Sequence, residues 1–177
     1  PPGPCPGDHR QVRGAGGRRV SGKPHLHIAL LCPEIPGNTG NIGRLALGLG
    51  ARLHLVHPLG FETGEKAARR AGIDHWAHVD RQEHDTEVDF FSWATGRRVH
   101  LFSTHGTRCF TQVDFQPGDV LLFGCESVGL PSRLVMEHGA WRIPLEGRVR
   151  SLNLSNAVAV VSYEALRQIR PVLFQQA

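Results

Sequence analysis

From His25 onward, short apolar runs alternate with segments of helical periodicity, and this alternation constrains the fold more than any other feature of the chain. Strands that alternate with helices are typical of an α/β domain with a largely parallel sheet. Most of the runs are short and apolar, as strands covered on both faces should be. The expected strands span residues 26–31, 53–56, 75–79, 99–103, 120–123 and 141–143.

The first helix is expected between the first two strands. Apolar residues from Ile42 to Leu49 recur at helical spacing, and Gly50 is a typical helix end. Asn41 and Arg44 lie beside each other, off this apolar stripe. Further helices are expected at residues 65–71, 87–94, 132–138 and 153–170.

The last expected helix, residues 153–170, is apolar on more than one face. Between Asn156 and Tyr163 its only polar member is Ser162. A helix that is apolar nearly all round has to be buried on two sides. The sheet covers one side, and a second subunit related by a twofold axis is the simplest cover for the other. The alternative is a helix sunk within the core of a monomer.

The length of 177 residues favours one domain with a short appendage. The net charge of +4 comes from residues 1–24, which hold five basic groups and one acidic group. The other 153 residues (177 minus 24) balance at fifteen basic and fifteen acidic groups, so only local clusters can attract RNA. Residues 1–24 are rich in Pro and Gly, and we expect a disordered tail there, a loose extension rather than an RNA-grasping arm. The folded domain is expected over residues 25–177.

Several classes of protein are disfavoured by what the sequence lacks. No apolar run approaches the roughly twenty residues of a membrane helix, and we expect a cytoplasmic protein with no membrane partner. Four cysteines lie far apart without a CxxC pair, which is typical of free thiols in a reducing compartment. Eleven histidines are scattered without an HExxH pattern, so we expect strand or surface residues and no metal.

Standard catalytic signatures are also missing. There is no GxxxxGK[ST] loop and no GxGxxG after the first strand, so NTP hydrolysis and hydride transfer lose their main support. Ser127 lies in a GxxSxG sequence rather than GxSxG, which does not form the tight elbow of a serine hydrolase.

Three loops rich in Gly, Asn and Ser accompany the ends of expected strands, within residues 34–44, 121–131 and 143–156. In an open α/β sheet, ligands gather at the carboxyl ends of strands, so these loops are expected to converge on one pocket. Glycine permits close approach of backbone to ligand, while Ser151 and Asn153 supply helix-capping or ligand-binding groups. Each loop alone is typical of turns and caps, but together they favour a binding site.

At these loops the sequence resembles the SPOUT superfamily of S-adenosylmethionine-dependent RNA methyltransferases, and most closely its TrmL (YibK-like) branch. The resemblance runs from about residue 27 to residue 168 and covers nearly the whole expected domain. Four motifs carry it, in the order of the family: Pro33-Glu34-Ile35-Pro36 with Asn38-Thr39-Gly40-Asn41-Ile42 and Arg44; Arg69-Arg70-Ala71-Gly72; Phe123-Gly124 with Glu126 and Gly129-Leu130-Pro131; and Arg150-Ser151 with Asn153-Leu154-Ser155-Asn156-Ala157-Val158 and Tyr163-Glu164-Ala165.

The resemblance implies a SPOUT fold, with a deep trefoil knot near the carboxyl terminus that forms the cofactor pocket. True knots are nearly absent from proteins, so general topology rules would have argued against this feature. The resemblance also implies a homodimer whose interface uses the first and last helices. That agrees with the two-sided apolarity of residues 153–170.

The resemblance further implies that S-adenosyl-L-methionine is the cofactor, held in a bent form largely by backbone groups. The positions that match the family's cofactor-binding sites are Phe102, Gly124, Ile143, Leu145, Ser151, Leu152 and Asn153.

The reaction implied is methyl transfer to the ribose 2′-hydroxyl of the tRNA wobble nucleotide, cytidine or uridine 34, in the anticodon loop. Arg44 matches the arginine of the family's first motif and is the expected catalytic residue. A guanidinium with a pKa above about 12 is a reluctant proton acceptor, so we expect Arg44 to grip a phosphate and the reacting hydroxyl rather than act as a base. The plain alternative is a surface arginine.

RNA contacts are expected from cationic and polar groups near these motifs. Close relatives often carry arginine between Glu126 and Gly129, whereas this chain has Val128, a departure that bears on RNA affinity. Two alternatives stay open: a SPOUT 2′-O-methyltransferase acting on ribosomal RNA, and a non-catalytic RNA-binding relative. The expected RNA-binding residues are Asn41, Arg69, Arg70, Arg148, Arg150 and Tyr163.

Overall fold

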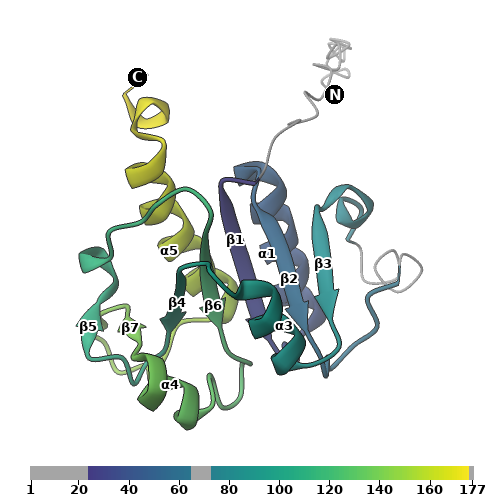
Figure 1. Cartoon of the computed structure of the whole chain (residues 1–177), viewed down its shortest axis with the longest axis horizontal. Coiled ribbons are helices and arrows are strands. Elements are labelled where there is room, and N and C mark those ends of the chain that lie inside the picture. Colours follow the sequence, from purple (N-terminus) through teal and green to yellow (C-terminus); the bar gives the residue numbers. More distant parts are fainter. Residues whose placement is uncertain (1–23, 65–72, 176–177) are drawn as a thin grey trace, which may run out of the picture.

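The structure is a computed structural model that describes residues 24–64 and 73–175. Its centre is a seven-stranded sheet with the order β3-β2-β1-β6-β4-β7-β5, and neighbouring strands are parallel throughout (Figure 1). The α/β fold with a largely parallel sheet is therefore confirmed. The strands are β1 (Leu26–Leu31), β2 (Arg52–Val56), β3 (Arg81–His84), β4 (Val99–Phe102), β5 (Arg108–Cys109), β6 (Asp119–Phe123) and β7 (Trp141–Arg142).

Strand β1 lies in the interior of the sheet, and all six of its residues are buried. Leu30 pairs with Leu55 of β2 on one side and with Phe123 of β6 on the other. Its side chains alternate between two cores, because successive residues of a strand point to opposite faces. The mostly apolar sequence of β1 is thus explained by helices on both faces.

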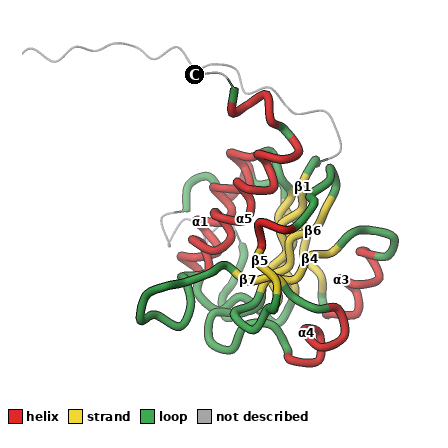
Figure 2. Tube along the Cα trace, turned by 90° about the vertical axis from the view of Figure 1, so that its left-hand side faces the viewer, coloured by secondary structure: helices red, strands yellow, loops and turns green. Residues whose placement is uncertain are grey.

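The helices form two layers, one on each face of the sheet (Figure 2). Helices α1 (Pro36–Leu49) and α5 (Leu154–Ile169) share one core with the sheet, in which Ile42 and Val158 are fully buried. Helices α3 (Glu87–Ala94) and α4 (Ser132–His138) cover the other face through Phe90 and Leu134. Short 3₁₀ turns complete the chain: η1 (Trp76–His78), η2 (Phe110–Gln112) and η3 (Pro171–Phe174).

Helix α1 ends as the sequence predicts. Gly50 takes a left-handed conformation with a φ of 66°, which glycine adopts without steric cost, and its N–H bonds to the carbonyls of the last turn. Pro36 occupies the first turn, where a missing N–H costs nothing.

Helix α5 buries one side only within the single chain. Val158, Val161 and Ala165 are fully buried against the sheet, whereas Val160 and Tyr163 are 41% and 51% exposed. The second apolar side predicted from the sequence therefore faces outward, available to another molecule.

The predicted strand at residues 75–79 is wrong. That segment forms η1, and Trp76 is buried there because it packs beside α1, where a Cβ on Gly43 would lie 2.9 Å from its ring. The true strand β3 begins at Arg81, and His84 is its one buried residue, since it is an edge strand. Its polar sequence gave no strand signal. Strand β5 was likewise not predicted, and the predicted helix at residues 65–71 lies outside the described residues.

Three histidines on neighbouring strands form a hydrogen-bonded row beneath α3. His27 Nδ1 lies 2.9 Å from His54 Nε2, and His54 Nδ1 lies 2.9 Å from His84 Nε2. The Trp93 ring covers the row, with its centroid 4.1 Å from that of His54. Burial lowers the pKa of His27 to about 4 and that of His54 to about 2. The three rings are therefore neutral at physiological pH. In each N···N contact, one ring nitrogen carries a proton and donates it to the other.

Candidate active site

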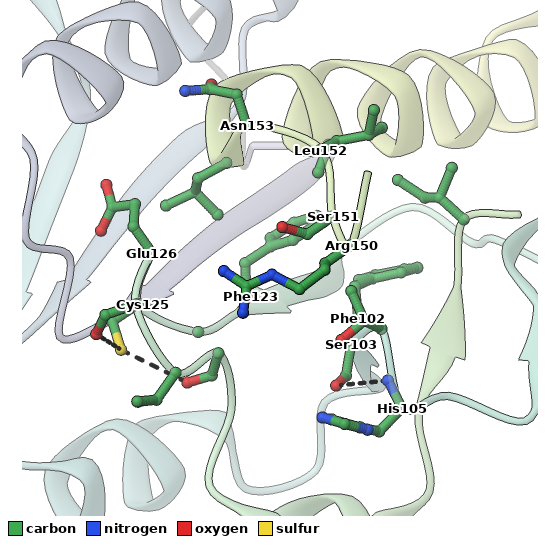
Figure 3. A pocket seen from close by; sticks show the side chains of 18 of the residues that line it. Phe102, Ser103, His105, Phe123, Cys125, Glu126, Arg150, Ser151, Leu152 and Asn153 are labelled. Carbon is green, nitrogen blue, oxygen red and sulfur yellow. Dashed lines mark hydrogen bonds between the residues drawn. The ribbon is translucent and has the colours of Figure 1, made fainter. Parts of the chain in front are cut away.

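A cavity of about 820 Å³ opens at the carboxyl ends of β4, β6 and β7 (Figure 3). Three loops line it, within residues 102–105, 123–129 and 141–154, and the start of α1 adds Ile35 and Asn38. This volume lies in the range of small-molecule and cofactor sites. The convergence of loops predicted from the sequence is thus found at this edge of the sheet.

The inner wall of the cavity is apolar and aromatic. The rings of Phe102 and Phe123 stack with centroids 5.0 Å apart and an interplanar angle of 19°. Ile143, Leu145 and Leu152 line the same cavity from the third loop. A wall of this kind suits a planar heterocycle, which loses little by leaving water and gains contact area.

The 124–129 loop doubles back so tightly that Gly124 cannot be replaced. A Cβ at this position would lie 2.0 Å from the carbonyl carbon of Gly129. Gly129 itself has a φ of 73°, and its N–H donates to the Cys125 carbonyl over 3.0 Å. The two glycines therefore fix the loop in a shape that exposes its backbone along the cavity.

Two carboxylates lock this loop to the segment that follows β1. Glu126 accepts hydrogen bonds from the backbone N–H groups of Glu34 (2.8 Å) and Ile35 (3.3 Å) and from Asn38 Nδ2 (2.9 Å). Glu34 in turn accepts from the N–H of Ser127 (2.9 Å) and from its hydroxyl (2.7 Å). These reciprocal bonds, here called the Glu34–Glu126 clasp, hold together loops that are 92 residues apart in the chain.

The third loop joins the clasp through a pair of asparagines. Asn153 Nδ2 donates to Asn38 Oδ1 over 2.9 Å, and Asn153 Oδ1 accepts from the N–H of Ser155 (2.9 Å) and its hydroxyl (2.7 Å). Asn153 is thus both the N-cap of α5 and a link to α1. One hydrogen-bond network therefore connects the segment after β1, the 124–129 loop and the third loop.

The structure places every expected cofactor-binding residue in the lining of this cavity. Arg150, predicted from the sequence to contact RNA, lines the cavity as well. Glu34 and Glu126 belong to the family motifs, but no role was predicted for either residue. The signal for such a role was an acidic residue in each of two glycine-rich loops at strand ends. The seven cofactor positions are Phe102, Gly124, Ile143, Leu145, Ser151, Leu152 and Asn153.

Arg44 lies outside this cavity, in a second and more open hollow on α1. Asn41 lines the same hollow, and His75 closes it on one side, with its Nε2 2.9 Å from the Gly40 carbonyl oxygen. Ile35 and Asn38 line both hollows, so the two adjoin at the start of α1. The hollow that contains Arg44, where we expect the substrate, is therefore next to the cavity where we expect the cofactor.

The remaining expected RNA contacts are more scattered. Tyr163 is exposed on α5, and Arg148 is exposed on the third loop without lining the cavity. Arg69 and Arg70 lie outside the described residues. Within residues 24–64 and 73–175, no three His, Cys, Asp or Glu side chains are grouped to hold a metal ion. No helix in this part of the chain is long and apolar enough to cross a membrane.

The profile of the SpoU rRNA methylase family matches residues 25–163. The chain belongs to this family. A tRNA (cytidine(34)-2′-O)-methyltransferase of Escherichia coli K12 is 43% identical over 147 residues, which is 81% of this chain and 94% of that protein.

Solved structures of proteins concerned with RNA methylation have the same fold. One, described as giving structural insights into the 2-OH methylation of C/U34 on tRNA, matches with a TM-score of 0.77 and 47% identity over 82% of this chain and 97% of its own. An AdoMet-bound rRNA methyltransferase of Sinorhizobium meliloti matches with a TM-score of 0.72 and 31% identity, over 81% of this chain but only 56% of its own. The SPOUT resemblance seen in the sequence is therefore confirmed.

Proposed function

We propose that this protein is an S-adenosylmethionine-dependent methyltransferase that modifies the ribose 2′-hydroxyl of the tRNA wobble nucleotide, cytidine or uridine 34. The observation that carries the proposal is the cavity lined by all seven expected cofactor positions and held by the Glu34–Glu126 clasp. The identity of 43% with the E. coli enzyme, spread over nearly the whole of that protein, supports this substrate.

The lining residues fit the proposed cofactor. Stacked Phe102 and Phe123 and the leucines of the third loop offer an apolar slot for adenine, and Gly124 lets the 124–129 loop fold back tightly beside this slot. The cofactor supplies an electrophilic methyl group on a sulfonium. The chain's task is to hold this group and the ribose oxygen in line, and such positioning contributes much of the rate in group transfer.

Arg44 is proposed to position the ribose. It is exposed on α1 in the hollow that adjoins the cofactor cavity, within reach of incoming RNA. Its planar fork can bind a phosphate and the reacting hydroxyl together, whereas a guanidinium does not release its own proton to act as a base. Asn41, Arg148 and Tyr163 are proposed as further RNA contacts, along with Arg69 and Arg70.

The working unit is proposed to be a cytoplasmic homodimer with a trefoil knot around the cofactor cavity. Support for the dimer comes from the outer faces of α1 and α5, which leave Leu47, Val160 and Tyr163 at 42%, 41% and 51% exposure. The two helices pack against each other, so these residues can form one surface. Sedimentation of the purified protein tests this, and a monomer at micromolar concentration would contradict it.

Methyl transfer to total RNA tests the proposed function directly. The purified protein is incubated with methyl-labelled S-adenosylmethionine and either total tRNA or ribosomal RNA, and the modified nucleotide is mapped. We expect label in tRNA, at the 2′-oxygen of nucleotide 34. Label confined to ribosomal RNA would replace the proposed substrate by the one named for the S. meliloti structure.

A further inference from the structure

Arg150 differs from Arg44 and Arg148 because its side chain, although exposed like theirs, lines the cavity. It follows Ile143 and Leu145 in the third loop and lines the cavity with them. In Figure 3 its guanidinium reaches from this loop toward the middle of the view, on the side of Glu126. Arg148, two residues earlier, is exposed and does not line the cavity.

The charge balance of the cavity leaves Arg150 without a partner. Among the lining residues it is the sole Arg or Lys. Glu126 is the one carboxylate in the lining, and its oxygens already accept three hydrogen bonds from Glu34, Ile35 and Asn38. Arg150 itself makes no hydrogen bond or ion pair to any residue within the described ranges. An unpaired cation over a partly apolar cavity favours an anionic ligand group.

We infer that Arg150 binds the carboxylate of the cofactor's amino-acid moiety. The inference rests on the proposed function, since it takes S-adenosylmethionine as the ligand of this cavity. The cofactor has a single anionic group, and a guanidinium presents paired N–H donors that match a carboxylate. With adenine in the apolar slot beside Phe102, this contact fixes the other end of the molecule. Arg150 is thus assigned to the cofactor rather than to an RNA phosphate.

Two ligands that differ in the carboxylate test this assignment by calorimetry without any turnover. S-adenosylhomocysteine has the amino-acid moiety, whereas 5′-methylthioadenosine lacks it and keeps the adenosine. We expect Arg150→Ala to weaken binding of S-adenosylhomocysteine by about tenfold or more, as loss of a charge-assisted hydrogen bond would. Binding of 5′-methylthioadenosine should stay within about twofold of the wild type.

Arg148→Ala is the matched control, because it removes the same charge from the same loop outside the cavity. We expect it to leave the affinity for both ligands unchanged. Arg150→Lys keeps the charge but loses the fork, so its loss for S-adenosylhomocysteine should lie between those of the wild type and Arg150→Ala.

Several results would overturn the assignment. Equal losses for both ligands in Arg150→Ala would mean that the side chain only shapes the loop. Unchanged affinity for both ligands, together with weaker binding of tRNA, would return Arg150 to the RNA contacts. If the wild-type protein bound neither ligand, the proposed function itself would fail, which is distinct from a failure of Arg150 alone.

Discussion

Asn153 Nδ2 donates a hydrogen bond to Asn38 Oδ1 over 2.9 Å and so joins the first turn of α5 to the first turn of α1. The two residues are 115 positions apart. Asn38 Nδ2 is held by Glu126, which fixes the direction of this amide and leaves its oxygen for Asn153. The pair therefore fixes the position of the third cavity loop relative to the 124–129 loop.

Substitutions of Asn153 should separate its two roles. Asn153→Asp keeps an oxygen that caps α5 at Ser155 but cannot donate to Asn38. Asn153→Ala loses both, and loss of an N-cap costs about 1 kcal/mol. In urea unfolding we expect Asn153→Ala to be less stable than Asn153→Asp, while calorimetry shows weaker cofactor binding in both. Equal stability of the two variants would contradict the capping role.

Glu126→Gln should loosen the clasp. One acceptor oxygen becomes an NH₂ group that faces either the N–H of Glu34 or the donors of Ile35 and Asn38, and an unsatisfied donor in such a place costs about 1–3 kcal/mol. We expect lower stability and weaker binding of S-adenosylhomocysteine. The control is Glu137→Gln on α4, where the side chain is 68% exposed. If both variants matched the wild type in both measurements, the clasp would have no part in forming the site.

Arg44→Lys should slow methyl transfer without affecting the cofactor. Lysine keeps the charge but loses the planar fork that holds the ribose and phosphate together. We expect the single-turnover rate on saturating tRNA to fall by at least about tenfold, and binding of S-adenosylhomocysteine to be unchanged, because Arg44 does not line that cavity. A wild-type rate would refute the positioning role.

Val128→Arg should strengthen RNA binding. Val128 is 79% exposed at the cavity lining, at the position where the family resemblance leads us to expect arginine. One more phosphate contact should tighten tRNA binding and steepen the dependence of log K on log salt by about one. Val88→Arg serves as control, since Val88 is 73% exposed on α3, across the sheet from α1. Equal gains in the two variants would indicate only a non-specific effect of charge.

The buried histidine row predicts acid sensitivity. The pKa of His27 and that of His54 lie below the ordinary 6.5 in the folded state, and that of His84 is lowered too, in each case mainly through burial. As the pH falls, these histidines take up protons in the unfolded chain before they do so in the folded protein. Their contribution to the free energy of unfolding is therefore fully present above about pH 6.5 and is lost as the pH drops toward 4. Each imidazole contributes up to about 1.4 kcal/mol per pH unit in this window.

Urea unfolding at successive pH values measures this slope. His84→Gln should make it shallower, because one titrating group leaves the row and an amide can still bond to His54. His138→Gln, at an exposed position on α4, should leave the slope as it is. A slope that is the same in all three proteins would exclude the histidine row as its source.

The parts of the fold that the sequence predicts are those in which one local pattern decides the structure. The apolar run of β1 and the stripe of α1 up to Gly50 are of this kind. Strand β3 could not be predicted, because an edge strand needs only one buried side chain, His84, and its other residues stay polar. Its extended conformation is fixed by hydrogen bonding to β2. Such pairing partners cannot be recognised from a short stretch of sequence.

The site, too, has parts that local sequence predicts and parts that depend on distant residues. Its loops and cofactor positions follow from glycine-rich motifs at strand ends and from the family resemblance. The Glu34–Glu126 clasp joins residues 92 apart, and nothing in either loop alone says which donors each carboxylate will meet. The place of Arg150 in the cavity lining was likewise missed, since Arg148 and Arg150 look alike in sequence and only the path of the loop separates them.

The network from Glu34 through Asn38 to Asn153 also bears on how the protein is made. Its two asparagines are 115 positions apart, so a nascent chain on the ribosome has no finished pocket until Asn153 has been synthesised and has left the ribosome. A shorter polypeptide therefore gains no stability from the cofactor through this network.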